Sequence, residues 1–244
     1  MNKFQVLAHR GLVSEFVPEN TLKAFADALH AGADVIETDI QCTKDGVPIV
    51  FHDDDLIRLA GIPKKISECT WKEISVIDIG FGKRIPSLEQ ALADFPTARF
   101  NLDIKTKMAE APVAEVVNLL QAQRRVLISS FNDLRSKRTC NLVEGDVRTS
   151  AGSWRVIGLW LSSALGATPL FSLLSRGVDA LQIPVSKFGL RFDSKRFIRK
   201  ALASKLEVHF WTVNDVAQVR KLKALGATGV VTDNCDIVIA VLKK

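Results

Sequence analysis

Short apolar runs alternate with segments of helical period from one end of the chain to the other. The apolar runs are rich in β-branched residues, which is typical of strands, whereas the segments between them carry apolar residues three and four positions apart, which is typical of amphipathic helices. The pattern predicts helices at residues 21–31, 111–122, 194–203 and 215–225. It predicts strands at residues 4–10, 34–40, 99–105, 125–131, 146–152, 180–186, 207–214 and 228–233.

The order of these elements indicates an α/β protein. Repeated strand–helix units favour a parallel sheet, and eight of them predict a closed (β/α)8 TIM barrel, with an open doubly wound sheet as the alternative. Because barrels of this length routinely form one domain, residues 1–244 are predicted to be a single domain. Gly32 and Gly226 directly follow two predicted helices, where a left-handed C-cap favours glycine. Asn20 is predicted to be the N-cap of the first helix.

Residues 47–86 do not fit the regular alternation. They contain one more strand-like run, "VPIVFHD", and then a long irregular stretch before the helical pattern resumes in "RIPSLEQALADF". This segment is predicted to be a small insertion between the second and third barrel units. Long loops in compact domains tend to carry function, so side chains of the insertion are expected at the site.

Residues 156–175 carry no charge over a length that could span a bilayer, but glycine, serine, threonine and proline interrupt the apolar pattern. A pair of short helices is predicted there. Peripheral contact with lipid is one interpretation of residues 154–171, because tryptophan suits a membrane interface. In the alternative, Trp154, Ile157, Leu161 and Leu165 share one side of a helix and pack it against the barrel.

Charge and cysteine usage narrow the class of partner. The net charge of +6 and the pI near 9.2 favour an anionic partner, which could be nucleic acid, a membrane surface or a phosphate-bearing substrate. The chain has no basic stripe interleaved with aromatic residues, so nucleic acid is not expected. The four cysteines are scattered, and no apolar leader precedes the first strand. A cytoplasmic protein is therefore predicted, with peripheral membrane contact as the variant.

Acidic side chains alternate along two neighbouring predicted strands. In "VIETDI" the apolar residues face the helices, which turns Glu37 and Asp39 toward the barrel interior; in "FNLDIK" the same rule turns Asn101, Asp103 and Lys105 inward. Three converging carboxylates without clustered cysteine or histidine indicate a hard cation, Mg²⁺ or Ca²⁺. The alternative is an internal salt-bridge cluster that uses the neighbouring basic side chains.

Two of the four histidines end strand-like runs, so both are expected at the mouth of the barrel. His9 precedes Arg10, and His52 precedes Asp53, which is predicted to orient the imidazole. Two imidazoles beside a cation and an arginine indicate a general base and a general acid around an anionic group, which is what phosphodiester cleavage requires. The remaining two are interpreted as structural: His30 at a helix end and His209 as a hydrogen-bonded core residue.

Several motifs together resemble the glycerophosphodiester phosphodiesterases: "HRG" followed by "PENT", then "GADVIETDIQCTKDGVPIVFHDDDLIR", "IPSLEQAL", "FNLDIK", "SSF", "WTVN" and "GVVTD". The similarity covers most of the chain and is weakest from about residue 133 to 210. The resemblance implies a TIM barrel that hydrolyses glycerophosphodiesters to glycerol 3-phosphate and an alcohol with a divalent cation. It also implies that a hydroxyl of the glycerol attacks phosphorus and gives a cyclic phosphate, which water then opens.

The resemblance also implies roles for individual residues. His9 and His52 correspond to the acid/base pair, Arg10 and Lys105 to phosphate contacts, Trp211 to a wall of the substrate site, and Glu37, Asp39 and Asp103 to the metal ligands. Glu19 of "PENT" is expected to reach the site. One departure concerns Asp103, which stands where the family commonly has glutamate; its side chain is one methylene shorter, which affects how the ion is held.

Two other functions fit the same residues. One is the same chemistry on a lipid, as in a lysophospholipase D or sphingomyelinase D; the charge-free stretch with Trp154 and Trp160 at its start favours it. The other is a barrel that binds phosphate esters without catalysis, against which the intact His9 and His52 argue. The alcohol moiety and the oligomeric state do not follow from the sequence.

Overall fold

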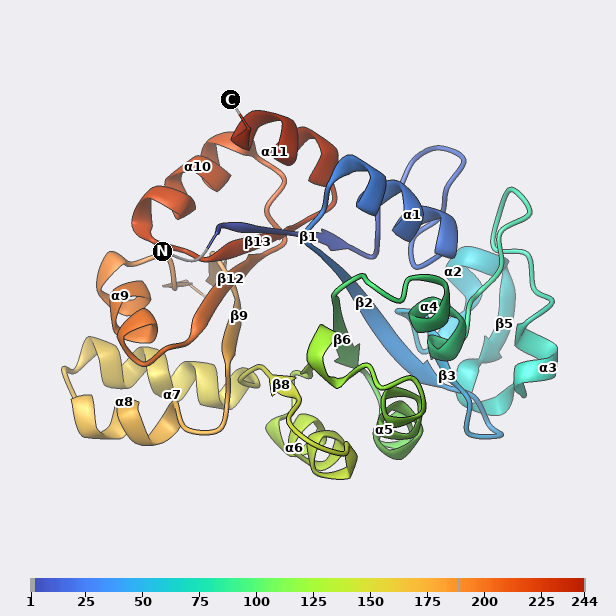
Figure 1. Cartoon of the computed structure of the whole chain (residues 1–244), viewed down its shortest axis with the longest axis horizontal. Coiled ribbons are helices and arrows are strands. Elements are labelled where there is room, and N and C mark those ends of the chain that lie inside the picture. Colours follow the sequence, from blue (N-terminus) through green and yellow to red (C-terminus); the bar gives the residue numbers. More distant parts are fainter. Residues whose placement is uncertain (1–2, 188, 244) are drawn as a thin grey trace.

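The computed structural model describes residues 3–187 and 189–243 and shows a nearly closed barrel of parallel strands surrounded by helices (Figure 1). The eight-stranded path confirms the predicted (β/α)8 fold, and its order is β8-β7-β6-β2-β1-β13-β12-β9. The strands are β1 (Gln5–His9), β2 (Val35–Cys42), β6 (Phe100–Ile104), β7 (Val126–Ser129), β8 (Arg148–Thr149), β9 (Ala180–Pro184), β12 (Glu207–Trp211) and β13 (Gly229–Thr232).

The barrel closes through a short seam between β8 and β9. An isolated parallel bridge pairs Ser150 with Ala180. Around it, the backbone amide of Ala151 donates to Ala180 (3.0 Å) and that of Asp179 donates to Thr149 (2.8 Å). The seam arises because β8 is only two residues long, so little of it is left to pair with β9.

Helices cover the outside of the barrel. Side chains of the strands that point outward, such as Ile36, Ile40 and Leu102, are fully buried in one large apolar core beneath the helices. Their alternation with inward-facing polar residues is what the predicted period of two requires. The helices are α1 (Leu22–Ala31), α4 (Leu88–Asp94), α5 (Glu110–Leu119), α6 (Asp133–Leu142), α7 (Ser153–Ala164), α8 (Thr168–Leu174), α9 (Lys195–Ala203), α10 (Val216–Leu225) and α11 (Cys235–Leu242).

The predicted C-caps are confirmed, but the predicted N-cap of α1 is wrong. Gly32 and Gly226 adopt left-handed φ values of 98° and 101° and donate to the last carbonyls of their helices. At the other end of α1 the capping side chain belongs to Thr21, which accepts from Ala24. Asn20 is buried with φ 57°, so its amide is aimed at β2 instead.

The predicted insertion forms a small layer of its own on one side of the barrel (Figure 1). Its first strand, β3 (Pro48–Val50), runs antiparallel to the end of β2. The other elements are β4 (Asp55–Leu56), α2 (Ile57–Ala60), β5 (Ile62–Lys65), η1 (Ile66–Glu68) and α3 (Trp71–Ile74). A separate apolar cluster that includes Phe51, Leu56 and Ile74 holds these elements together, and this packing fixes the position of His52 at the end of β3.

The charge-free stretch forms the two predicted short helices, α7 and α8, on the opposite side from the insertion (Figure 1). Within the described residues, no helix is both long and apolar enough to cross a bilayer. The interpretation that Trp154, Leu161 and Leu165 pack against the barrel is wrong, because they are 83%, 46% and 81% exposed. The buried face of α7 contains Val156, Leu159, Ser162 and Ser163.

Candidate active site

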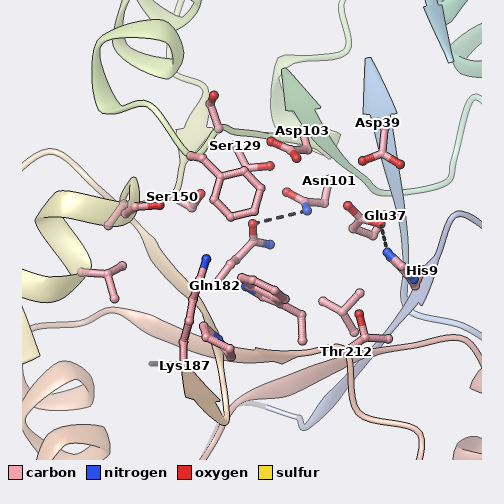
Figure 2. A pocket seen from close by; sticks show the side chains of 18 of the residues that line it. His9, Glu37, Asp39, Asn101, Asp103, Ser129, Ser150, Gln182, Lys187 and Thr212 are labelled. Carbon is pink, nitrogen blue, oxygen red and sulfur yellow. Dashed lines mark hydrogen bonds and ion pairs between the residues drawn. The ribbon is translucent and has the colours of Figure 1, made fainter. Parts of the chain in front are cut away.

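A cavity of about 500 Å³ opens at the carboxyl ends of the barrel strands. Figure 2 looks into it, with His9, Glu37, Asp39 and Asp103 on one side and Ser150 and Lys187 on the other. The structure brings to the wall of this cavity the eight residues to which the sequence assigned catalytic, substrate-binding or metal-binding roles: His9, Arg10, Glu37, Asp39, His52, Asp103, Lys105 and Trp211.

Three carboxylates and one lysine occupy the polar side of the cavity. Asp39 and Asp103 lie opposite each other in the register of β2 and β6. The ammonium of Lys105 lies between them, 2.7 Å from Asp39 Oδ1 and 2.6 Å from Asp103 Oδ2. Glu37 is one inward position below Asp39, and its buried Oε2 has no hydrogen-bond partner among the residues that the structure describes. The internal ion-pair arrangement of Lys105 with Asp39 and Asp103 therefore exists, but it does not include Glu37 Oε2.

Burial and neighbouring charges shift the pKa values of the three carboxylates in different directions. Burial, together with the neighbouring Asp39 carboxylate, raises the pKa of Glu37 to about 8. Burial also raises the pKa of Asp103. Burial acts in the same direction on Asp39, but Lys105 and Arg10 outweigh it and hold the pKa of Asp39 below its usual value. Glu37 Oε2 faces the His9 imidazole at 4.0 Å, beyond hydrogen-bond distance, so a bound cation would lower the pKa of Glu37.

The donor set suits a hard divalent cation, since it consists of carboxylate oxygens on two adjacent strands with one oxygen unpartnered. In the part of the chain that the structure describes, no three acidic, histidine or cysteine side chains form a ready-made metal-binding group. The ammonium of Lys105 lies within ion-pair distance of both Asp39 and Asp103, so a cation shared by these two carboxylates would have to displace it.

His9 is anchored by an acidic residue that the sequence interpretation did not assign. Its Nδ1 lies 2.6 Å from Oδ1 of Asp233, directly after β13. The amide of Asn214 donates to the other oxygen of Asp233 at 2.6 Å, and the side-chain oxygen of Asn214 accepts from Thr232 and from the Asp233 backbone. On the opposite edge of the ring, Nε2 is 4.0 Å from Glu37 Oε2. The imidazole is therefore held from behind with Nε2 toward the cavity.

The pKa values in this pair reflect mutual stabilisation. Burial would lower the pKa of His9, but the hydrogen bond with Asp233 and the charge of Glu37 raise it overall. The hydrogen bond from His9 lowers the pKa of Asp233. The contact with Asp233 therefore shifts the His9 equilibrium toward the protonated imidazole and brings its pKa closer to neutral pH, where an imidazole can both accept and donate a proton.

His52 has a comparable partner, as predicted. Its Nδ1 lies 2.7 Å from Asp53 Oδ1. Arg58 of α2 binds the other oxygen of Asp53 (2.6 Å) and also both oxygens of Glu19 (2.6 and 3.1 Å). Glu19 in turn accepts from Arg10 at 2.9 Å, so it reaches the site through this arginine. Arg58 therefore connects the residue that holds His52 with the residue that holds Arg10.

Arg10 occupies an unusual backbone conformation, with φ 58°. Its amide donates to Glu37 O and its carbonyl accepts from the amide of Asn20, both at 2.8 Å. This turn brings its Nε to 3.1 Å from Asp39 Oδ2. A left-handed residue other than glycine costs free energy and is found where the surrounding structure enforces it, often at functional sites.

The side of the cavity away from the carboxylates is mainly apolar, with Ser150 and Lys187 as polar side chains on it. It is formed by Phe131 after β7, by Trp154 and Ile157 of α7, and by Leu190 and Phe192 near the hairpin β10 (Ser186–Lys187) and β11 (Leu190–Arg191). Phe131 lies at the border: its ring packs edge-on against Trp211 at 5.8 Å, and the Lys105 ammonium lies over it at 5.7 Å. The cavity can thus hold a group with an anionic end and an apolar end.

His209 is buried, as predicted, but it is not hydrogen-bonded. Neither ring nitrogen has a partner with hydrogen-bond geometry among the described residues, and the nearest carboxylate oxygen, Glu207 Oε2, is 3.4 Å from Nε2. Higher in the barrel interior, the amide of Asn101 lies 3.4 Å from the side-chain oxygen of Gln182 (Figure 2). His209 therefore belongs to the floor of the barrel and not to the cavity.

A parallel barrel with two carboxylate-anchored histidines, an arginine, a lysine and clustered carboxylates at its catalytic mouth defines a hydrolase of phosphoric diesters. The family model described as "Glycerophosphoryl diester phosphodiesterase family" matches residues 9–237. The chain belongs to this family and is a glycerophosphodiester phosphodiesterase.

This chain is also similar to individual members of the family, in sequence and in structure. The chain is 32% identical over 236 residues to probable glycerophosphodiester phosphodiesterase 2 of Mycobacterium tuberculosis (strain ATCC 25618 / H37Rv), which covers 97% of this chain and 89% of that protein. It is 27% identical over 266 residues to lysophospholipase D GDPD1 of Homo sapiens, covering 93% and 82%. The structure of an Oleispira antarctica phosphodiesterase in complex with the product sn-glycerol-3-phosphate superposes with a TM-score of 0.79 at 23% identity, covering 98% and 97%. This last comparison shows the shared fold.

Proposed function

We propose that the chain hydrolyses small glycerophosphodiesters to glycerol 3-phosphate and an alcohol, with His9 and His52 as the general acid and base. The observation that carries the proposal is the pair of imidazoles, each held through Nδ1 by a carboxylate, at the mouth of one cavity. The Oleispira antarctica structure contains sn-glycerol-3-phosphate, which is the phosphate product of the proposed reaction.

The two histidines move protons in opposite directions. One removes the proton from the glycerol hydroxyl next to the phosphate, whose oxygen then forms a bond to phosphorus. The other donates a proton to the alcohol oxygen as its bond to phosphorus breaks, which leaves a cyclic phosphate. Water opens the ring with the roles reversed, and both histidines return to their original protonation states.

The basic residues bind the phosphate. Arg10 is held by Glu19 and Asp39, so its guanidinium is already oriented toward the polar side of the cavity. Lys105 supplies a second positive charge, and Trp211 forms the wall beside Phe131. Charge fixed in place in this way stabilises the additional negative charge of the transition state.

We propose that Glu37, Asp39 and Asp103 hold a divalent cation, Mg²⁺ or Ca²⁺. When bound, the cation neutralises phosphate charge. The unpartnered Oε2 of Glu37 supports this assignment. Exhaustive chelation is expected to abolish activity, and Glu37→Gln is expected to weaken cation binding measured by calorimetry. Full activity with no residual metal by elemental analysis would contradict the assignment.

The test of the histidine roles uses two leaving groups. His9→Ala and His52→Ala are each expected to lower kcat on an alkyl diester by ~10²-fold or more. With a p-nitrophenyl diester the leaving group needs no proton, so the variant that lacks the general acid should recover much of its activity. His30→Ala, an exposed histidine of α1, is the control. Near-full turnover of either site variant on every diester would refute that histidine's role.

A second candidate is the same reaction on a lipid phosphodiester, at a membrane surface touched by residues 154–171. The exposed apolar face of α7 and the apolar side of the cavity favour it. The human relative at 27% identity is named a lysophospholipase D. A panel of glycerophosphodiesters and lysophospholipids, assayed with Mg²⁺, Ca²⁺ and Mn²⁺, separates the two candidates. Vesicle sedimentation with anionic lipid at low salt tests the membrane contact.

A further inference from the structure

Two amide side chains in the barrel interior have polar atoms left open. Asn101 of β6 and Gln182 of β9 both line the catalytic cavity, and Asn101 Nδ2 donates to Gln182 Oε1 in a long hydrogen bond of 3.4 Å (Figure 2). The other polar atom of each amide, Asn101 Oδ1 and Gln182 Nε2, is buried and has no hydrogen-bond partner among residues 3–187 and 189–243. Burial without a partner is unfavourable, so a ligand that pairs with both atoms would gain affinity from them.

The two open atoms are one acceptor and one donor. An amide has an oxygen that accepts and a nitrogen that donates, so the pair leaves one of each open whichever way the two groups are turned. An ionised phosphate oxygen could only accept a hydrogen bond, and an ammonium could only donate one. A hydroxyl does both, so the chemistry of this pair fits an alcohol.

The amide pair lies at the depth of His9. In the strand register His9 of β1 is opposite Glu37 of β2, and Glu37 is opposite Asn101, so three neighbouring strands place these residues at one level of the barrel. Asp103, which binds the Lys105 ammonium, is the next inward position toward the mouth, roughly 7 Å further along β6. A substrate whose phosphate lies beside Lys105 can therefore reach the amides with a short carbon chain.

The amides border the inner end of the cavity. Beneath them, the floor of the barrel around His209 contains a void of about 20 Å³, which has room for about one water molecule. The leaving alcohol must depart through the mouth, so the inner end is expected to hold the glycerol unit. Glycerol brings two hydroxyls there: the one next to the phosphate attacks phosphorus, and the terminal one takes no part in the reaction.

We propose that Asn101 and Gln182 recognise the terminal hydroxyl of the glycerol unit, which donates to Asn101 Oδ1 and accepts from Gln182 Nε2. This inference rests on the proposed phosphodiesterase reaction and adds to it the residues that select glycerol over other diols. The contact fixes the far end of the three-carbon chain, so the neighbouring hydroxyl is held in place for attack. Both amides act by binding and neither transfers a proton.

The test compares two substrates that differ by one hydroxyl. A glycerophosphodiester and the matching diester of 1,2-propanediol have the same leaving alcohol and the same attacking hydroxyl, but the second lacks the terminal hydroxyl. We expect the unaltered protein to hydrolyse the glycerol diester with kcat/KM about 10²-fold higher, because the propanediol diester leaves a buried donor and acceptor unpaired. Equal kcat/KM values would overturn the hydroxyl site and leave the proposed reaction standing.

Near-isosteric variants identify the residues responsible. Asn101→Leu and Gln182→Met remove the hydrogen-bonding atoms with little change in volume, and in the double variant the ratio of the two kcat/KM values should approach unity. Asn141→Leu, an exposed asparagine of α6, is the matched control and should keep the full ratio. Melting temperature checks folding. A folded double variant that retains the full preference would overturn the assignment, because the amides would then hold water only.

Binding of the products is measured without turnover, and in the unaltered protein it needs no variant. Calorimetry with Mg²⁺ compares glycerol 3-phosphate with the phosphate ester of 1,2-propanediol, and inorganic phosphate reports the phosphate end alone. Glycerol 3-phosphate should bind ~10-fold more tightly than the propanediol ester, and the difference should disappear in the double variant. Equal affinities in the unaltered protein would overturn the hydroxyl site. A preference for glycerol 3-phosphate in a protein that hydrolyses no diester would support the site and refute the proposed reaction.

Discussion

The Nδ1 of His9 and the Oδ1 of Asp233 are 2.6 Å apart, although the two residues stand at opposite ends of the chain. They meet because β1 and β13 are neighbours in the barrel. The side-chain amide of Asn214 donates to the second oxygen of Asp233, which orients the first oxygen toward the imidazole. Asp233 is therefore a positioning residue for His9.

Replacing this carboxylate by an amide should separate positioning from folding. Asp233→Asn is expected to lower kcat by ~10²-fold or more, because the amide neither fixes the imidazole tautomer nor stabilises the imidazolium. KM should change little, since Asp233 is outside the phosphate-binding residues. Asp236→Asn, an exposed aspartate three residues later, is the control. An unchanged kcat in Asp233→Asn would show that the contact has no catalytic importance.

Arg58 should influence two residues that it does not touch. Arg58→Ala removes the partner of both Asp53 and Glu19, so His52 and Arg10 lose their fixed orientation together. We expect kcat to fall and KM to rise, whereas Arg58→Lys should restore only part of each, because an ammonium cannot bind two carboxylates as a planar guanidinium does.

A surface ion pair in the same insertion provides the control for Arg58. Lys64 binds Glu73 at 3.0 Å away from the cavity, and Lys64→Ala should leave both kinetic constants unchanged. A double-mutant cycle of Arg58→Ala with Glu19→Gln should show strong non-additivity in kcat/KM. Additive effects would mean that Arg58 does not act through Glu19.

Gly11 should tolerate no side chain. It adopts φ 87°, and a Cβ at this position would lie 2.7 Å from the backbone and side chain of Ala24. Gly46 has nearly the same φ, 85°, with no atom near its Cβ direction. Gly46→Ala should therefore cost about 1–2 kcal/mol from backbone conformation alone. Gly11→Ala should cost several kcal/mol more, measured by urea unfolding; equal losses would contradict the close approach.

Glu207 on the barrel floor should make stability depend on pH. Burial would raise its pKa, but His209 and Arg148 lower it to about 2. A carboxylate with a lowered pKa stabilises the folded state above its ordinary pKa of 4.5, and this contribution is lost as the pH falls toward 2. Unfolding free energies should differ between the unaltered protein and Glu207→Gln by about 2–3 kcal/mol at pH 7 and by roughly half that at pH 3. A difference that is constant with pH would refute this.

The sequence predicted the parts of the site that depend on strand periodicity. Alternation along β2 and β6 was enough to place Glu37, Asp39 and Asp103 in the barrel interior, because a strand has only two faces. The same rule, applied to the end of β13, could have drawn attention to Asp233, which follows the strand directly. Its pairing with His9 depends on barrel closure, which no local pattern encodes.

Contacts made by loops were beyond the sequence pattern. Arg58 reaches Glu19 only because the insertion folds back over the loop after β1, and the two are far apart in the chain. Asn20 looked like a helix cap because its residue type favours that position. Its actual conformation is set by buried hydrogen bonds to Thr38 and Asp39, so tertiary contacts overrode the local preference.

The short seam between β8 and β9 is the weakest strand-to-strand connection in the barrel, so the barrel should open there first. Elsewhere each strand is joined to its neighbours by a ladder, but at the seam the flanking bonds are those of Ala151 and Asp179. Helix α7 is connected to the ring at this gap, since it follows β8 directly. Thermal expansion of the ring would therefore be concentrated beneath Trp154, and amide hydrogen exchange should be fastest among the barrel strands at β8. A ligand that contacts residues on both sides of this seam would hold β8 and β9 together and slow amide hydrogen exchange there.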